Sequence, residues 1–274
     1  MVFVDKEHTM LGFERLVRFS PDIFHFTTTR RGGCSQGNYA SMNCTHYCGD
    51  EIDCVRKNKE LLLQKFPESP VALLVPHQTH GTGIMDVDED FLSMEEKERN
   101  ACLENIDALI TDLPGYCLCV STADCVPVLL YDPSRKVVAA VHAGWRGTVS
   151  CILYKTLMRM KEKYGCDGCQ ILAGIGPSIS GISFEVGDEV YEAFKNAGFP
   201  MERLSFRHWE TSKWHIDLWE ANRLQLMEAG VPAEQIELAG ICTYQNPDLF
   251  FSARRLGSKS GRILTGIQLN ASSV

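Results

Sequence analysis

The chain has 274 residues, of which 45% are hydrophobic, a composition that supports a large folded core rather than a disordered chain. Acidic residues outnumber basic ones by 35 to 27, so the surface lacks the positive excess that nucleic-acid binding needs. No secretory or transit pattern opens the sequence, and no uncharged apolar run approaches the roughly 18 residues of a membrane span. We expect a cytoplasmic protein with a small-molecule partner, no nucleic acid and no membrane.

The N-terminal third predicts two strands and one helix. Alternation in 24–29 favours a strand, and 50–66 forms a helical pattern with Val55 and Leu62 on its apolar face. Residues 71–80 predict a strand that runs into a turn.

The middle of the chain predicts a set of adjacent buried strands. Short apolar, β-branched runs occupy 107–111, 116–122, 126–132 and 136–144, separated by turn residues. Apolar residues then recur at helical spacing over 146–164, so we expect one amphipathic helix packed on the sheet.

The C-terminal third predicts a strand at 170–175, helices over 186–198 and 216–230, and strands at 236–243 and 261–269. Each of these helices ends at a glycine suited to a C-cap. Hairpin-like pieces in the middle argue against a purely parallel sheet. No repeat or linker marks a boundary, so we expect a single compact α/β domain over 1–274 with mixed sheets.

Twelve cysteines are scattered along the chain. Without an export signal, we expect reduced thiols rather than a disulfide framework. Cys166 and Cys169 form a lone CxxC, which we interpret as incidental rather than as a metal or redox site.

Metal-type ligands occur where three predicted strands end: HQTH at 77–80, TADC at 122–125 and VHAGWRG at 141–147. Such strand ends open onto crevices in α/β folds. One thiolate and two imidazoles suit zinc, and a set of three ligands leaves a fourth position open, as in catalytic zinc sites. Packing or surface exposure is the ordinary alternative for each such residue.

HQTH offers two histidines. It lacks the helical HxxxH spacing and the glutamate of a metalloprotease. We select His80, rather than His77, as the ligand to accompany Cys125 and His142.

Arginine recurs beside glycine and serine at 27–33, 144–147 and 250–262. Guanidinium groups and glycine-rich turns suit anions such as phosphate and carboxylate. A solvated basic turn is the alternative for each segment taken alone.

Taken together and in order, these segments resemble the laccase-domain or YfiH-like family of purine-nucleoside enzymes, also described as polyphenol oxidases. The resemblance runs from about Phe24 to Leu269. Its motifs are TTTRRGGCSQGNYASMNC, HYCGD, VPHQTHG, DALIT, STADCVPVLLYD, VHAGWRGT, GIGPSIS with FEVGDEV, and CTY followed by FFSARR and SGRILTGI. The sequence departs from the usual pattern at 34–36 and 42–44, and loses no metal-type ligand.

The resemblance implies an α/β/β/α layered fold with a zinc centre, copper being the alternative metal, held by three catalytic residues: His80, Cys125 and His142. It implies phosphorolysis of adenosine, inosine, guanosine or methylthioadenosine with phosphate, together with adenosine deamination. Matched by position, Arg30, Asn43, Arg254 and Arg255 are the expected substrate-binding residues. The sequence leaves open the preferred nucleoside, the balance of the two activities and the oligomeric state.

Three other functions compete with this one. A copper-dependent polyphenol oxidase of the multicopper type needs about ten imidazoles, often in His-x-His pairs, whereas this chain has eight histidines and no such pair. A cysteine hydrolase would use Cys125 as nucleophile and His142 as base. A non-catalytic nucleoside-binding protein would not need three convergent metal ligands.

Overall fold

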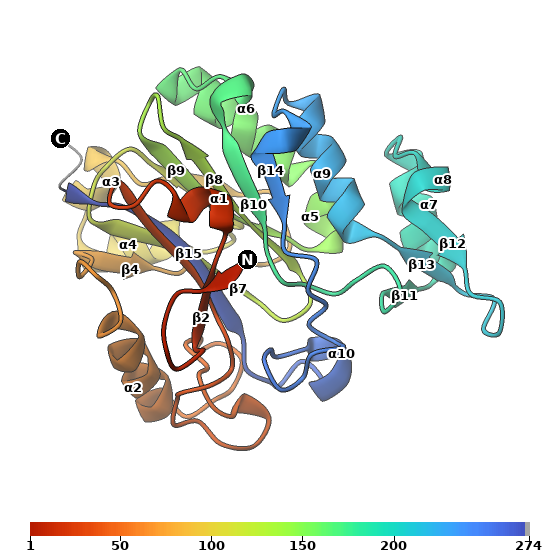
Figure 1. The fold of residues 1–274 in the computed structure, drawn as a ribbon, viewed down its shortest axis with the longest axis horizontal. Coiled ribbons are helices and arrows are strands. Elements are labelled where there is room, and N and C mark those ends of the chain that lie inside the picture. The colour runs from red at the N-terminus through yellow and green to blue at the C-terminus, as the bar shows by residue number, and fades with distance from the viewer. Residues whose placement is uncertain (272–274) are drawn as a thin grey trace.

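The computed structural model describes residues 1–271, and its centre is a pair of six-stranded sheets stacked face to face (Figure 1). The first sheet has the spatial order β1 (Val2–Phe3), β2 (Met10–Gly12), β3 (Ile23–Thr28), β15 (Ile263–Leu269), β7 (Tyr116–Thr122) and β4 (Ala72–Leu74). Only β4 is parallel to its neighbour, β7, and the other pairs are antiparallel.

The second sheet has the order β14 (Ile236–Leu238), β10 (Leu172–Ile175), β8 (Val126–Asp132), β9 (Val137–Ala143), β6 (Ala108–Thr111) and β5 (Ile84–Asp86). Its two outer pairs, β10 with β14 and β5 with β6, are parallel, whereas the central pairs are antiparallel. Both sheets are therefore mixed, as the hairpin-like pieces of the sequence predicted.

Strand alternation divides the core into layers. On β8, Leu129 and Tyr131 face the other sheet, whereas Val128 and Leu130 face the helices. Such side chains contribute about 1.5–3 kcal/mol each when fully buried, so a strand buried on both faces needs a nearly continuous apolar sequence. The run VPVLLYD satisfies that need, since all seven residues are buried.

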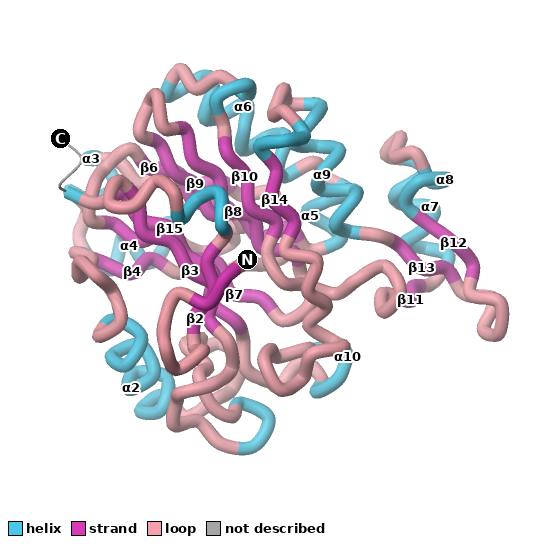
Figure 2. Tube along the Cα trace, viewed as in Figure 1, coloured by secondary structure: helices cyan, strands magenta, loops and turns pink. Residues whose placement is uncertain are grey.

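Helices cover the outer face of each sheet (Figure 2). Leu62 of α2 (Ile52–Leu63) packs in the cluster on the first sheet. The second sheet is covered by α5 (Trp145–Val149), α6 (Ile152–Tyr164) and α9 (Leu218–Glu228). This arrangement confirms the α/β/β/α layering and the single compact domain.

The remaining elements are short. They are α1 (Glu14–Val17), α3 (Glu89–Ser93), α4 (Glu96–Cys102), α10 (Ala253–Leu256) and the 3-10 turns η1 (Gly37–Tyr39), η2 (Gly168–Gln170) and η3 (Ala233–Gln235). A small sheet with the order β11 (Glu185–Val186), β13 (Trp214–Ile216) and β12 (Ser205–Arg207) forms an arm with α7 (Asp188–Asn196) and α8 (Met201–Leu204). The arm projects beside α9 (Figure 1).

The single helix expected over 146–164 is two helices, which corrects the sequence prediction. Cys151 has a φ of 59°, a left-handed conformation that interrupts the helix between α5 and α6. The Thr148 carbonyl accepts hydrogen bonds from the Cys151 amide at 3.0 Å and from Gln225 Nε2 at 2.9 Å. Gln225, which lies on α9, thus stabilises the break between α5 and α6. The spacing of apolar residues in the sequence does not reveal this contact.

The twelve cysteines are free thiols, with Cys166 buried and Cys169 exposed. In the described part of the chain, no helix has both the length and the apolar character required to cross a bilayer.

Candidate metal centre

Three sequence-distant side chains meet at one end of the stacked sheets. His80 lies in the turn after β4, Cys125 lies between β7 and β8, and His142 lies near the end of β9. Their candidate ligand atoms all lie within 4.8 Å of one another. The two imidazole rings are nearly perpendicular, with centroids 4.9 Å apart. One thiol and two imidazoles thus form a group that could hold a metal ion.

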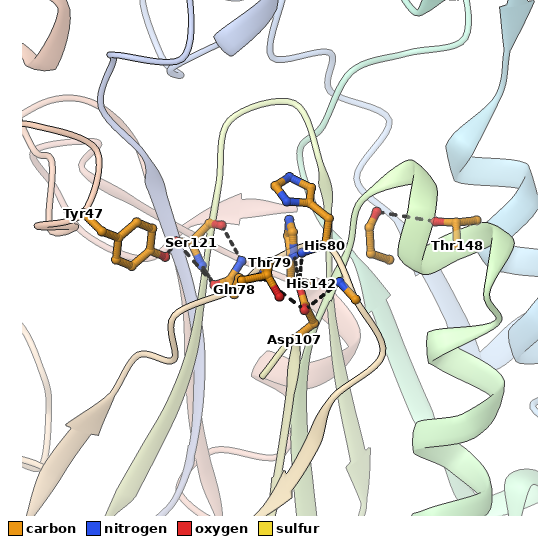
Figure 3. A network of polar contacts seen from close by, with 10 residues as sticks. Tyr47, Gln78, Thr79, His80, Asp107, Ser121, His142 and Thr148 are labelled. Carbon is orange, nitrogen blue, oxygen red and sulfur yellow. Dashed lines mark hydrogen bonds and ion pairs between the residues drawn. The ribbon is translucent and has the colours of Figure 1, made fainter. Parts of the chain in front are cut away.

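Asp107, immediately before β6, positions both histidines (Figure 3). Its Oδ1 lies 2.7 Å from Nδ1 of His142 and accepts the His80 amide at 3.0 Å. Its Oδ2 accepts the Gly81 amide at 2.8 Å. Because Asp107 engages Nδ1 of His142, the Nε2 atom of that ring is the one left to face a metal ion.

The backbone carrying His80 is strained, and Asp107 stabilises it. His80 has a φ of 64°, a conformation that non-glycine residues rarely adopt. The hydrogen bonds from the amides of residues 79–81 to one carboxylate hold this turn in place. Burial raises the pKa of Asp107, but its contacts with His142 and these amides outweigh that effect and lower it.

A second buried carboxylate fixes the turn that carries Cys125. Asp124 also has a positive φ, 85°. Its carboxylate accepts hydrogen bonds from Thr243 Oγ1 at 2.7 Å, Ser252 Oγ at 3.0 Å and the Arg254 amide at 2.7 Å. These hydrogen bonds connect the turn between β7 and β8 to residues 243–254, which lead into α10.

Gly144 packs directly against the three candidate ligands. A Cβ atom placed on it would lie 2.8 Å from Cδ2 of His80, 3.2 Å from Sγ of Cys125 and 3.6 Å from Cε1 of His142. Its φ of -66° is ordinary for any residue. Glycine is therefore required here by close packing rather than by backbone conformation.

The electrostatics of the group favour a thiolate at Cys125. Burial alone raises the pKa of this thiol, but the charge of His142 and hydrogen bonds from both histidines lower it to about 6. Burial lowers the pKa of His142, whereas the Cys125 thiolate and Asp107 raise it to about 9. Thiolate and imidazolium thus stabilise each other, and a cation at the same place would favour the thiolate in the same way.

The three ligands lie in a cavity of about 570 Å³ whose walls carry aromatic rings and arginines. Tyr47, Trp145 and Phe184 supply the rings, and Arg254 and Arg262 supply the charges. The Arg254 guanidinium lies 5.5 Å from the Phe184 ring centroid. The cavity therefore combines flat apolar surface with positive charge.

Of the four expected substrate-binding residues, the structure brings only Arg254 into this lining. Arg255 donates two hydrogen bonds to the Tyr244 carbonyl, at 3.1 and 2.7 Å. Asn43 is fully buried, and its side chain accepts the Arg262 amide at 3.0 Å. Arg30 donates to the Ala40 and Pro247 carbonyls and lines a separate pocket.

His77 lies outside the group, because its Nδ1 pairs with Glu104 Oε2 at 2.6 Å and its side chain is 45% exposed. Four further residues belong to the site although their sequence pattern did not single them out: Asp107, Gly144, Tyr47 and Arg262. Asp107 opens the DALIT strand and Gly144 follows the HA of HAGWRG, so both sat within recognised segments. Their roles depend on contacts between residues that are far apart in the sequence, and a local sequence pattern does not show such contacts.

Comparison with known proteins supports one family. Residues 24–270 match the family model described as multi-copper polyphenol oxidoreductase laccase. A Bacteroides thetaiotaomicron protein named purine nucleoside phosphorylase is 56% identical over 270 residues, covering 98% of this chain and 100% of that protein. Adenosine deaminase RL5, from an unknown prokaryotic organism, is 42% identical over 242 residues, covering 88% and 92% of the two chains.

Solved structures agree with the fold. The crystal structure of YlmD from Geobacillus stearothermophilus has a TM-score of 0.87 at 30% identity, covering 98% of this chain and 99% of that one. The resemblance drawn from the motifs is thus confirmed over nearly the whole chain. The protein belongs to the multi-copper polyphenol oxidoreductase laccase family, the YfiH-like proteins.

Proposed function

We propose that this chain is a zinc-dependent purine nucleoside phosphorylase that splits adenosine, inosine, guanosine or methylthioadenosine with phosphate, and that it also deaminates adenosine. The observation that carries the proposal is the convergence of His80, Cys125 and His142 within 4.8 Å in a cavity of about 570 Å³. The names of the relatives at 56% and 42% identity support the two activities.

The cavity suits both substrates. Its volume falls within the roughly 300–1,000 Å³ typical of small-molecule sites. Tyr47, Trp145 and Phe184 offer rings for stacking a purine base, whereas Arg254 and Arg262 offer charge for phosphate. We assign substrate contact to Arg254, and support of the surrounding loops to Arg30, Asn43 and Arg255.

The metal ligands fit zinc, because a Cys/His2 set leaves one tetrahedral position open. When bound, zinc would supply Lewis acidity and lower the pKa of a bound water to about 7, as deamination at purine C6 requires. In phosphorolysis the attacking group is phosphate and charge develops on the leaving base and the ribose. Arg254 and Arg262 then supply positive charge beside the phosphate, and Asp107 keeps Nε2 of His142 directed at the centre.

Copper is the alternative metal, since it binds such ligands more tightly than zinc in the Irving-Williams order. The name of the matching family model favours this alternative. A single Cys/His2 centre does not provide the several copper ions of a multicopper oxidase. Metal analysis of protein purified without chelators, together with a polyphenol oxidation assay, distinguishes the two metals and their activities.

A cysteine hydrolase is favoured by one contact. The Nδ1 of His142 lies 2.7 Å from Asp107, so Cys125, His142 and Asp107 match the nucleophile, base and orienting group of a triad. A thiolate bound to metal is not free to attack. If zinc is the cofactor, turnover should resist thiol alkylation and vanish with a strong chelator, whereas a hydrolase should show the reverse.

The proposed function is tested by incubating the metal-loaded protein with inosine, with and without phosphate, and by measuring hypoxanthine release. Adenosine without phosphate tests deamination through inosine formation. We expect Cys125→Ala to lose both metal and turnover while the fold persists. Phosphate-dependent base release by a zinc-free protein would refute the role of the metal, and release that needs no phosphate would refute phosphorolysis.

A further inference from the structure

Thr122, the residue that ends β7, carries a buried hydroxyl for which the described residues provide no partner. The residue is 1% exposed, and its Oγ1 makes no hydrogen bond with any described protein atom. Thr122 also lines the cavity that holds the candidate metal ligands. Buried hydroxyls in native proteins are nearly always paired, so this one requires an explanation.

Strand alternation indicates where the Thr122 side chain points. On β7, Leu118 and Val120 belong to the core between the two sheets, and Thr122 is the next residue on that face. On β9, Ala140 belongs to the same core and His142 is the next residue on its face. Thr122 and His142 therefore face the same layer between the sheets, one from each sheet.

The chemistry of this position fits a neutral partner. A threonine hydroxyl can donate one hydrogen bond and accept two without carrying charge. The arginines of the cavity, Arg254 and Arg262, suit the phosphate anion. The nucleoside, by contrast, offers uncharged donors and acceptors on its base and its ribose.

We propose that Thr122 is a binding residue for the nucleoside, with its hydroxyl pairing to an uncharged polar atom of the base or the ribose. The inference rests on the proposed function, since it assumes that a purine nucleoside occupies this cavity. It explains why a polar residue, Thr122, follows the apolar residues on this face of β7. It also predicts that the hydroxyl contributes to affinity more than to stability.

The test compares Thr122→Val, which keeps the shape and removes the hydroxyl, with Thr122→Ser, which keeps the hydroxyl. Thr45→Val is a matched control, because Thr45 is also 1% exposed with an unpartnered Oγ1 but does not line the cavity. Binding of inosine to the zinc-loaded protein is measured by calorimetry in phosphate-free buffer, where phosphorolysis does not occur. Hypoxanthine serves as a second probe that lacks the ribose.

We expect Thr122→Val to weaken inosine binding about tenfold, the effect of losing one paired hydrogen bond. Thr122→Ser and Thr45→Val should stay within about threefold of the unmodified protein. Zinc content should be unchanged, and the Tm of ligand-free Thr122→Val should not fall, because no protein hydrogen bond is removed. If hypoxanthine binding weakens equally, the partner is on the base, and if only inosine binding weakens, the partner is on the ribose.

Other results separate this inference from the function beneath it. If the unmodified protein bound neither inosine nor adenosine, both the proposed function and the inference would fall. If it bound inosine and Thr122→Val bound it equally well, only the inference would be wrong. Loss of zinc from Thr122→Val, or a change confined to the KM for phosphate, would also overturn the assignment to the nucleoside.

Discussion

Replacing Gly144 by alanine tests how tightly the candidate metal ligands are packed. The new Cβ would lie 2.8 Å from Cδ2 of His80, whereas carbon atoms in contact prefer about 3.5 Å or more. Relief of this overlap requires a displacement of about 0.7 Å, several times the roughly 0.2 Å tolerance of metal-ligand distances. We expect zinc affinity to fall about 10- to 100-fold and kcat/KM about 100-fold.

The same substitution should have two opposing effects on stability. Alanine adopts the φ of -66° found at Gly144 without strain, so the loss of backbone freedom in the unfolded chain stabilises by about 0.4–1 kcal/mol. Overpacking opposes this by about 1–3 kcal/mol, so the free energy of unfolding should fall by no more than about 2.6 kcal/mol.

The assays are zinc per chain in graded zinc buffers, phosphate-dependent hypoxanthine release and urea unfolding. Gly81→Ala is the matched control, because its added Cβ would meet Oδ2 of Asp107 at 3.5 Å, an ordinary contact. This control should lose much less zinc affinity than Gly144→Ala. Normal zinc affinity and kcat/KM in Gly144→Ala would show that the ligands are not held by close packing.

Three further predictions concern the groups around the ligands. Asp107→Asn should weaken zinc binding about 10- to 100-fold in chelator competition, because asparagine keeps only one accepting oxygen and its amide nitrogen cannot accept the hydrogen bonds that the second carboxylate oxygen receives. Unchanged affinity would exclude a positioning role for Asp107. Zinc affinity should fall more steeply as pH drops below about 6, because the Cys125 thiolate there gains a proton that the metal must displace. Zinc titrations from pH 5 to 8 check this. His77→Ala should keep its zinc. The free energy of unfolding should change by less than about 1 kcal/mol, because the ion pair between His77 and Glu104 is exposed. Loss of zinc would mean that the wrong histidine was selected.

Much of the fold could be predicted because local patterns agree with the packing. The apolar runs at 116–122 and 126–132 coincide with β7 and β8, since a strand buried on both faces needs an uninterrupted apolar sequence. The helix α9 begins where Asp217 caps it, with its carboxylate accepting the Trp219 and Glu220 amides at 2.9 and 3.0 Å.

Other parts depend on contacts between distant segments, which local patterns do not contain. The strand expected over 236–243 ends at Leu238, and beyond it Cys242 forms an isolated bridge with Ser178, which lies outside the named strands. The strands of the arm have two or three residues each, too short for a clear period.

The candidate site, like the fold, could be predicted from the sequence only in part. The motifs containing His80, Cys125 and His142 identified the residues that converge, because metal-type side chains at strand ends are conspicuous in a sequence. Arginines next to glycine did not separate Arg254, which lines the cavity, from Arg255, which is not among the lining residues. The side chains of adjacent residues point in different directions, and the sequence does not show which of the two points into the cavity.

The position of β15 has a consequence for how the protein is made. This strand lies between β3 and β7, pairing Thr265 with Thr27 on one side and with Val120 on the other. During synthesis the ribosome must deliver residues 263–269 before β3 and β7 can be joined, so the loop to be closed spans most of the chain. Until then the turn that carries Cys125 is held by only one completed sheet, so the three candidate metal ligands should come together only after β15 has paired with both of its neighbours.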